Sequence, residues 1–124
     1  MLYYDSMTLR SPHEKPVYVR LRETIADAIL SGRYTDGDAL PSVRALAADE
    51  AANPLTVAKA YQGLQNDGLV VVKRGVGLFV APGARARLRS SERTQFLHEE
   101  WPAICERMSR LGIDSAELIE REKA

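Results

Sequence analysis

Apolar residues recur at a helical spacing in the first part of this chain of 124 residues. From Pro16 to Gly32 they return every three or four positions, which predicts an amphipathic helix. Pro16 suits the first turn of this helix, and Gly32 suits the residue just past its end. Residues 34–38 then form a turn cluster around an Asp-Gly pair. Residues 1–14, before the first helix, are expected to form an arm whose apolar start is either a small strand or a loose extension.

Two further helices are marked by the residues that open them. Pro41 and Ser42 begin one, and the Ser42 side chain can accept a hydrogen bond from an early backbone N–H. Asn53 as N-cap and Pro54 at the first helical position begin the next. With a turn of about 100° per residue, that helix has a packing face and an opposite face free to contact a partner. The packing face holds Val57, Ala60, Tyr61 and Leu64, and the opposite face holds Leu55, Lys59, Gln62 and Asn66.

A β-hairpin is predicted directly after these helices. Gly68 ends the last helix, and two short apolar runs, residues 70–72 and 78–80, flank a glycine-rich turn. Lys73 and Arg74 fall at the tip. Three helices followed by such a hairpin make a winged helix-turn-helix, so the expected fold class is mainly α with a small β-hairpin (α+β).

A charged helix with an apolar seam is predicted beyond Pro82. The seam residues are spaced four, three, four and three, the heptad rhythm of helix-on-helix packing; they are Leu97, Trp101, Ile104, Met108 and Leu111. Pro102 is expected either to kink this helix or to start a new one. Gly112 ends it, and Asp114 with Glu117 resembles a capping box for a last helix that reaches about Glu122.

The domain boundaries follow from these elements. We expect an arm at residues 1–14, a winged helix-turn-helix DNA-binding domain at residues 15–81 and a C-terminal helical element at residues 82–124. The seam of the last element needs a partner, and a second copy of the chain is the favoured one. Packing of the seam on its own domain or on the last helix is the alternative.

Composition and charge exclude several classes of protein. The 45% hydrophobic and 27% charged residues are ordinary for a globular protein, and 17 basic residues balance 17 acidic ones, which predicts weak non-specific affinity for DNA. No apolar run reaches the roughly 18 residues of a membrane span, and no signal peptide is evident, so we expect a cytoplasmic protein without membrane contact. The lone Cys105 excludes an intrachain disulfide. His13 and His98 have no neighbours at ligand spacing, so we expect no metal, no cofactor and no catalytic site.

The winged pattern predicts how the chain would contact DNA. A helix-turn-helix inserts the start of its second helix into the major groove, where Lys59 or Gln62 can hydrogen-bond purine edges and Leu55 or the Thr56 methyl can touch a thymine methyl. Arg44 would hold a phosphate or reach a base, and the wing cations would lie against the backbone or the minor groove. The predicted DNA-binding residues are Ser42, Arg44, Asn53, Leu55, Thr56, Lys59, Gln62, Lys73, Arg74, Gly75 and Gly77.

Five short motifs in this stretch resemble those of one protein family. They are Leu40-Pro41-Ser42-Val43-Arg44-x-Leu46-Ala47, Asn53-Pro54-x-Thr56-Val57, Ala60-Tyr61-Gln62-x-Leu64, Asp67-Gly68-Leu69 and Arg74-Gly75-x-Gly77-x-Phe79-Val80. Residues 15–81 therefore resemble the winged-helix domain of GntR-type bacterial transcription factors. The short tail is similar to that of the YtrA subfamily, in which two C-terminal helices make a homodimer.

The resemblance implies a function. It implies a homodimeric repressor that binds an inverted-repeat operator in double-stranded DNA and controls its own operon, which in many relatives encodes a transporter. It also implies release by a small-molecule effector whose identity the sequence does not name. Because the tail is too short to enclose a large pocket, we expect the effector at the dimer interface or against the winged domain, near Tyr61, Phe96 and Trp101.

The chain also departs from the family pattern. Residues 50–52 stand where relatives usually have Leu-Gly-Val, so Ala51 would pay about 1–2 kcal/mol if it adopts the left-handed conformation. Pro54 and Ala58 replace arginines of many relatives, and Leu55 replaces a frequent asparagine. Base contacts made by those arginines are therefore not expected here. The competing hypothesis is a winged helix that binds an acidic protein partner through Lys73 and Arg74.

Overall fold

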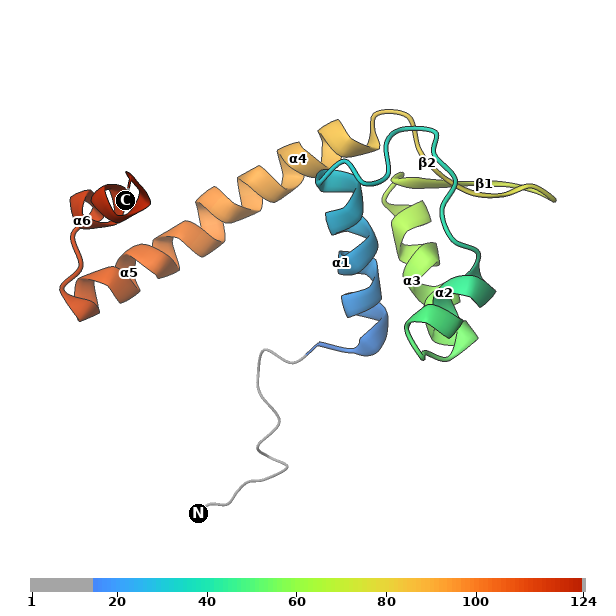
Figure 1. Ribbon diagram of the computed structural model, residues 1–124, viewed down its shortest axis with the longest axis horizontal. Coiled ribbons are helices and arrows are strands. Elements are labelled where there is room, and N and C mark those ends of the chain that lie inside the picture. The colour runs from blue at the N-terminus through green and yellow to red at the C-terminus, as the bar shows by residue number, and fades with distance from the viewer. Residues whose placement is uncertain (1–14, 124) are drawn as a thin grey trace, which may run out of the picture. The chain divides into compact units, whose positions relative to one another are not determined.

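The computed structural model describes residues 15–123 (Figure 1). The predicted arm, residues 1–14, lies outside the described residues. The chain divides into two compact units, the first ending at Ala86 and the second beginning at Arg87. The elements are α1 (Val17–Leu30), α2 (Val43–Asp49), α3 (Pro54–Asn66), β1 (Val70–Lys73), β2 (Gly77–Val80), α4 (Ala84–Gln95), the π-helical segment η1 (Phe96–Glu100), α5 (Trp101–Leu111) and α6 (Ser115–Lys123). The expected fold class, a winged helix-turn-helix with a C-terminal helical element, is confirmed.

The core of the first unit lies where α3 packs against α1 and α2. Each helix contributes one apolar face, as the spacing of its apolar residues predicts. The buried residues of these three helices are Leu21, Ile25, Ile29, Leu46, Ala47, Val57, Ala60, Tyr61 and Leu64. The predicted packing face of α3 is therefore confirmed, and its opposite face is turned outward.

Both predicted N-caps are present at the two helices of the helix-turn-helix. The Ser42 hydroxyl accepts a hydrogen bond from the Ala45 N–H at 3.0 Å, and the Asn53 side chain accepts one from the Leu55 N–H at 2.8 Å. In the turn between α2 and α3, Ala51 has a φ of 51°, and it is the one non-glycine residue with positive φ in the described part of the chain. The turn therefore keeps the left-handed geometry without the glycine that usually provides it.

The hairpin projects from the three helices of the first unit (Figure 1). Strands β1 and β2 are antiparallel, with Val70 opposite Val80 and Lys73 opposite Gly77. The loop before α2 runs along β2, because the Leu40 N–H donates to the Leu78 carbonyl oxygen at 2.8 Å. The wing is thus fixed at its base by Val80, which is fully buried, while its tip is free.

The second unit contains a change of helical register at the proline. The Trp101 N–H bonds to the carbonyl oxygen of Phe96, five residues earlier, and α5 begins at Trp101 with Pro102 in its first turn. Proline has no N–H, and in a regular α-helix its ring would crowd the carbonyl of His98. A π-helical turn before Pro102 avoids this conflict, so the α-helical register restarts there.

The last helix begins where the sequence predicts. Gly112 ends α5 in the left-handed conformation, with a φ of 69°. The Asp114 side chain then accepts a hydrogen bond from the Ala116 N–H at 3.2 Å, and the Glu117 N–H donates to the Asp114 backbone carbonyl at 2.9 Å. Helix α6 ends at Lys123, close to the predicted end at about Glu122.

Candidate nucleic-acid interface

The outward face of α3 presents the side chains predicted to read DNA. Leu55 is 79% exposed beside the capped N-terminus, an unusual exposure for leucine, and Thr56 next to it is half-buried. About two turns after Leu55, Gln62 is exposed, and its amide donates to the Asn66 side-chain oxygen at 3.0 Å. This hydrogen bond holds the Gln62 amide along the helix surface, where its other polar atoms can meet a base edge.

Lys59 is also on this face, but its ammonium group has a partner in α1. The Nζ atom of Lys59 lies 3.9 Å from the centre of the Tyr18 ring, within the range of a cation–π contact. Sequence reasoning placed Lys59 on the correct face of α3 and missed its contact. No sequence signal links the two residues, because the contact exists only after α1 packs on α3.

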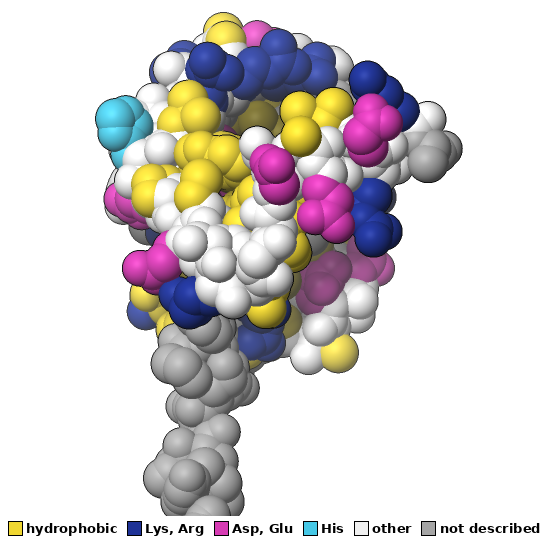
Figure 2. Space-filling model, turned by 90° about the vertical axis from the view of Figure 1, so that its left-hand side faces the viewer, with side chains coloured by type: hydrophobic (Ala, Val, Ile, Leu, Met, Phe, Trp, Pro, Cys, Tyr) yellow, Lys and Arg dark blue, Asp and Glu magenta, His cyan; other side chains and the backbone are white. Residues whose placement is uncertain are grey.

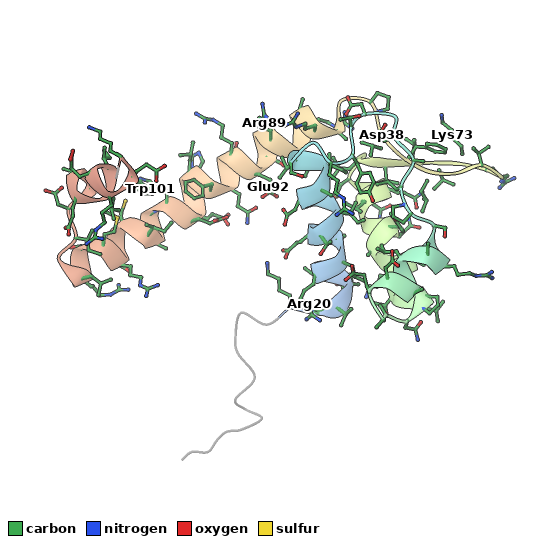
Figure 3. The ribbon with its side chains drawn as sticks, viewed as in Figure 1. Arg20, Asp38, Lys73, Arg89, Glu92 and Trp101 are labelled. Atoms are coloured by element: carbon green, nitrogen blue, oxygen red, sulfur yellow. The ribbon has the colours of Figure 1, made fainter. Side chains whose placement is uncertain are left out.

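The cations of α2 and the wing differ in how they are held. No described residue makes a hydrogen bond or ion pair with the guanidinium of Arg44 or Arg74, and both arginines are exposed. Lys73 instead turns back along the hairpin, and its Nζ atom lies 4.6 Å from the centre of the Phe79 ring (Figure 3). Arg74 is therefore the free cation of the wing tip in this structure.

The wing tip is shaped by its two glycines. Gly75 has a φ of +76° and Gly77 has a φ of +149°, values that residues with a Cβ atom rarely adopt. A Cβ at Gly75 would meet open space, so the backbone rather than crowding requires glycine there. Between them Val76 is 72% exposed. The tip thus offers an apolar side chain and a free guanidinium on a narrow loop.

The predicted seam of the second unit is an open apolar face. Its residues Leu97, Trp101, Ile104 and Leu111 are between 40% and 61% exposed, Met108 is half-buried, and Leu118 and Ile119 of α6 are exposed as well. Figure 2 shows hydrophobic side chains gathered on the surface of the chain. Within the described part of the second unit, α6 leaves this face open.

The three residues expected around an effector differ in how far they are exposed. The Tyr61 side chain is only 2% exposed, and its hydroxyl donates to the Pro41 carbonyl oxygen at 2.6 Å. Burial, with a smaller effect of Tyr34, raises the pKa of Tyr61 well above its usual range. Phe96 and Trp101 lie in the second unit, where their rings stack with centres 6.5 Å apart. Of the three expected residues, Phe96 and Trp101 therefore present surface to a ligand, and Tyr61 does not.

This geometry agrees with the comparisons to known proteins. The family model "Bacterial regulatory proteins, gntR family" matches residues 17–80. The chain belongs to the GntR family. A similar protein is the HTH-type transcriptional repressor YtrA of Bacillus subtilis, which is 34% identical over 81% of this chain and 71% of its own length.

Solved structures of GntR regulators have the same fold. A GntR family transcriptional regulator from Listeria monocytogenes superimposes with a TM-score of 0.72 at 29% identity, over 91% of this chain and 97% of that one. The DNA-binding domain of AraR, solved in complex with operator ORR3, superimposes with a TM-score of 0.57 at 27% identity, over 65% of this chain and 95% of that one. The chain is thus a DNA-binding transcriptional regulator of the GntR family and not an enzyme.

Two negative findings complete the description of this GntR regulator. No helix within residues 15–123 is both long and apolar enough to cross a membrane. The same residues contain no group of three or more histidine, cysteine, aspartate or glutamate side chains placed to hold a metal ion.

Proposed function

We propose that this GntR regulator is a homodimeric repressor that binds an inverted-repeat operator in double-stranded DNA. The observation that carries the proposal is the exposed N-terminal half of α3, where Leu55 is 79% exposed beside a capped helix end. A helix-turn-helix places this end of its second helix in the major groove. The free wing of the same unit supports a second contact with the backbone or the minor groove.

Each side chain of the interface has a proposed role. Leu55 and Thr56 touch thymine methyl groups, and Gln62 and Lys59 hydrogen-bond base edges. Arg44 and Arg74 bind phosphates, since neither makes an ion pair with a described residue.

Other residues of the predicted set act through the backbone. Ser42 and Asn53 hold the first turns of α2 and α3, whose remaining N–H groups then favour phosphate. Gly75 and Gly77 let the wing backbone approach the DNA closely.

The open apolar seam of the second unit supports the dimer. A stripe that leaves Trp101, Ile104 and Leu111 between 40% and 61% exposed is a liability for a monomer, and a second copy would cover it. Two copies related by a two-fold axis would then read two half-sites of opposite orientation, about one helical turn apart.

The proposal includes repression and its release. The relative from Bacillus subtilis is named a transcriptional repressor, and we extend that role to this chain. In this proposal the chain represses its own operon, which encodes a transporter. A small-molecule effector would bind at the dimer interface beside the stacked rings of Phe96 and Trp101. It would release DNA only if it prefers a dimer whose two reading heads are wrongly spaced.

Selection of bound fragments from random duplexes tests the proposal. The full chain should enrich a palindrome with two half-sites about 10–10.5 base pairs apart, centre to centre. The Arg44→Ala and Arg74→Ala double variant serves as the matched control, and it should recover the same motif with weaker overall binding. Recovery of no enriched palindrome by the unaltered protein would overturn the proposal. A reporter gene behind the recovered site should lose expression when the regulator is present, whereas a gain would exclude repression.

A further inference from the structure

The lysine of the recognition helix rests on an aromatic ring of a different helix. Tyr18 is the second residue of α1, and its half-buried ring faces the Nζ atom of Lys59 at 3.9 Å. The Lys59 side chain leaves the outward face of α3, so its ammonium group would otherwise be free to sweep across a wide surface. The ring confines the ammonium group to the boundary between α1 and α3.

The neighbouring charged side chains at the start of α1 have other partners than Lys59. The Arg20 guanidinium donates to the Lys15 carbonyl oxygen at 2.7 Å, and the Lys15 ammonium pairs with the Glu23 carboxylate at 2.6 Å. Figure 3 shows Arg20 at this end of α1. Within residues 15–123, no carboxylate pairs with Lys59, and the ring of Tyr18 is its contact. A ring attracts the ammonium group without neutralising its charge, so Lys59 remains available to an acceptor on DNA.

We propose that Tyr18 is a positioning residue for Lys59 and thereby determines part of the base preference of α3. The inference rests on the proposed function, because it needs Lys59 to contact a base edge. With the ring present, the ammonium group points at one acceptor in the major groove. Without it, Lys59 reaches several phosphates and bases in turn, so the regulator keeps its general affinity for DNA and loses preference at one base pair.

Ring chemistry and ring shape can be separated at this position. Tyr18→Phe keeps the aromatic face, Tyr18→Leu removes it, and pentafluorophenylalanine keeps the shape while reversing the charge distribution of the face. Tyr34→Leu is the matched control, since the Tyr34 ring also carries a cation, Arg33 at 5.6 Å, but lies in the loop after α1. Thermal unfolding of each variant establishes that it folds. If Tyr18→Leu does not fold, the fluorinated variant still tests the inference.

The measurement is the affinity for the selected operator relative to operators with single base-pair changes, with the salt dependence of binding recorded alongside. Tyr18→Leu and the fluorinated variant should lower the preference several-fold at the base pair where Lys59→Ala lowers it, with an unchanged salt slope. Tyr18→Phe and Tyr34→Leu should match the unaltered protein. Adding Tyr18→Leu to Lys59→Ala should cause no further loss, because the ring then has nothing to position.

Three results would overturn the inference. These are an unchanged preference in the variants that lack an electron-rich ring, equal losses on operator and random DNA, and losses that multiply in the double variant. In all three cases the unaltered protein still prefers its operator, and the proposed function stands. An unaltered protein without any base preference would instead remove the proposed function itself.

Discussion

The hydroxyl group of Tyr61 donates a hydrogen bond to the carbonyl oxygen of Pro41 at 2.6 Å. Tyr61 belongs to α3, and Pro41 directly precedes the N-cap of α2, so this bond ties the two helices of the helix-turn-helix together. Burial raises the pKa of Tyr61, which keeps the hydroxyl protonated and able to donate. A partly buried polar contact thus joins α3 to the start of α2, in addition to their apolar packing.

Tyr61→Phe should therefore destabilise the regulator. The change leaves the Pro41 carbonyl without its donor in a partly buried setting, and we expect a loss of about 1–2 kcal/mol in the free energy of unfolding. Urea denaturation measures this loss. The same change at Tyr18 is a matched control, since the Tyr18 hydroxyl makes no hydrogen bond with a described residue. Equal losses from the two variants would contradict a specific role of the Tyr61 bond.

Ala51→Gly should stabilise the turn between α2 and α3. The left-handed conformation that Ala51 adopts, with a φ of 51°, costs alanine about 1–2 kcal/mol, whereas glycine there loses only its larger backbone entropy. We expect a net gain of about 0.5–1 kcal/mol in the free energy of unfolding, measured by denaturant titration. Ala48→Gly, at an exposed position in the last turn of α2, should instead lose up to about 1 kcal/mol. A loss at both positions would show that Ala51 is not strained.

These examples show which features the sequence can predict. Caps and turns are local, so Ser42, Asn53 and Gly112 could be assigned from their own neighbours, and the apolar spacing of α3 identifies its buried face. The motif residues of the wing and the helix-turn-helix carried the family assignment for the same reason. For the predicted DNA-reading face of α3, the sequence indicates which residues point outward. It does not indicate which contacts their side chains make.

The features that could not be predicted are of two kinds. Some depend on contacts between residues of different elements, and others depend on which of two backbone conformations is adopted. The Lys59–Tyr18 and Lys73–Phe79 contacts arise only when helices pack and strands pair in a particular register. At Pro102 the sequence indicates a conflict with the helix and leaves open how it is resolved. The π-helical turn resolves it and also brings Phe96 and Trp101, five positions apart, into a stack.

Acid should lower the free energy of unfolding through Asp38, in the loop before α2. Its carboxylate accepts hydrogen bonds from the Thr35 N–H at 2.8 Å and the Thr35 hydroxyl at 3.0 Å, and these bonds hold the pKa of Asp38 below its ordinary 3.8. A group with a lowered folded pKa stabilises the fold above its unfolded pKa, and the contribution disappears as pH falls through the folded value. The stability advantage of the unaltered protein over Asp38→Asn should therefore shrink below pH 3.8.

Thermal unfolding across that pH range measures the effect. Thr35→Val keeps the backbone donor and loses the hydroxyl, so it should show an intermediate pH dependence. A difference between Asp38→Asn and the unaltered protein that stays constant down to pH 2 would show that the Asp38 carboxylate contributes nothing in its charged form.

Phosphate anchors and base readers should separate in DNA-binding measurements. Arg44→Ala or Arg74→Ala should weaken binding to all sequences and reduce the salt slope by roughly one unit, if each arginine neutralises one phosphate. Gln62→Ala should instead relax the preference at a single base pair by about 1–3 kcal/mol, with little change in slope. Titrations at several salt concentrations against the operator and its single-pair variants distinguish the two patterns. A uniform loss for Gln62→Ala would reassign Gln62 as an anchor.

Trp101→Asp should convert the proposed dimer to monomers. Trp101 is 41% exposed in the single chain and lies on the apolar seam with Ile104 and Met108, so a dimer through this face would bury it. A carboxylate there would lose its hydration without gaining a partner, and the dimer would dissociate. Light scattering measures the mass, and operator binding should fall toward the affinity for one half-site.

The control for this change uses the same charge on another face of α5. Ala103 is exposed and lies two positions after Trp101, so its side chain does not share the seam. Ala103→Asp should therefore stay dimeric and bind the full operator. If Trp101→Asp also stays dimeric, the interface lies elsewhere, and the N-terminal arm becomes the next element to alter. If both variants are monomeric, the helix as a whole has been disturbed, and the seam would have to be tested by changing Ile104 to a smaller apolar residue.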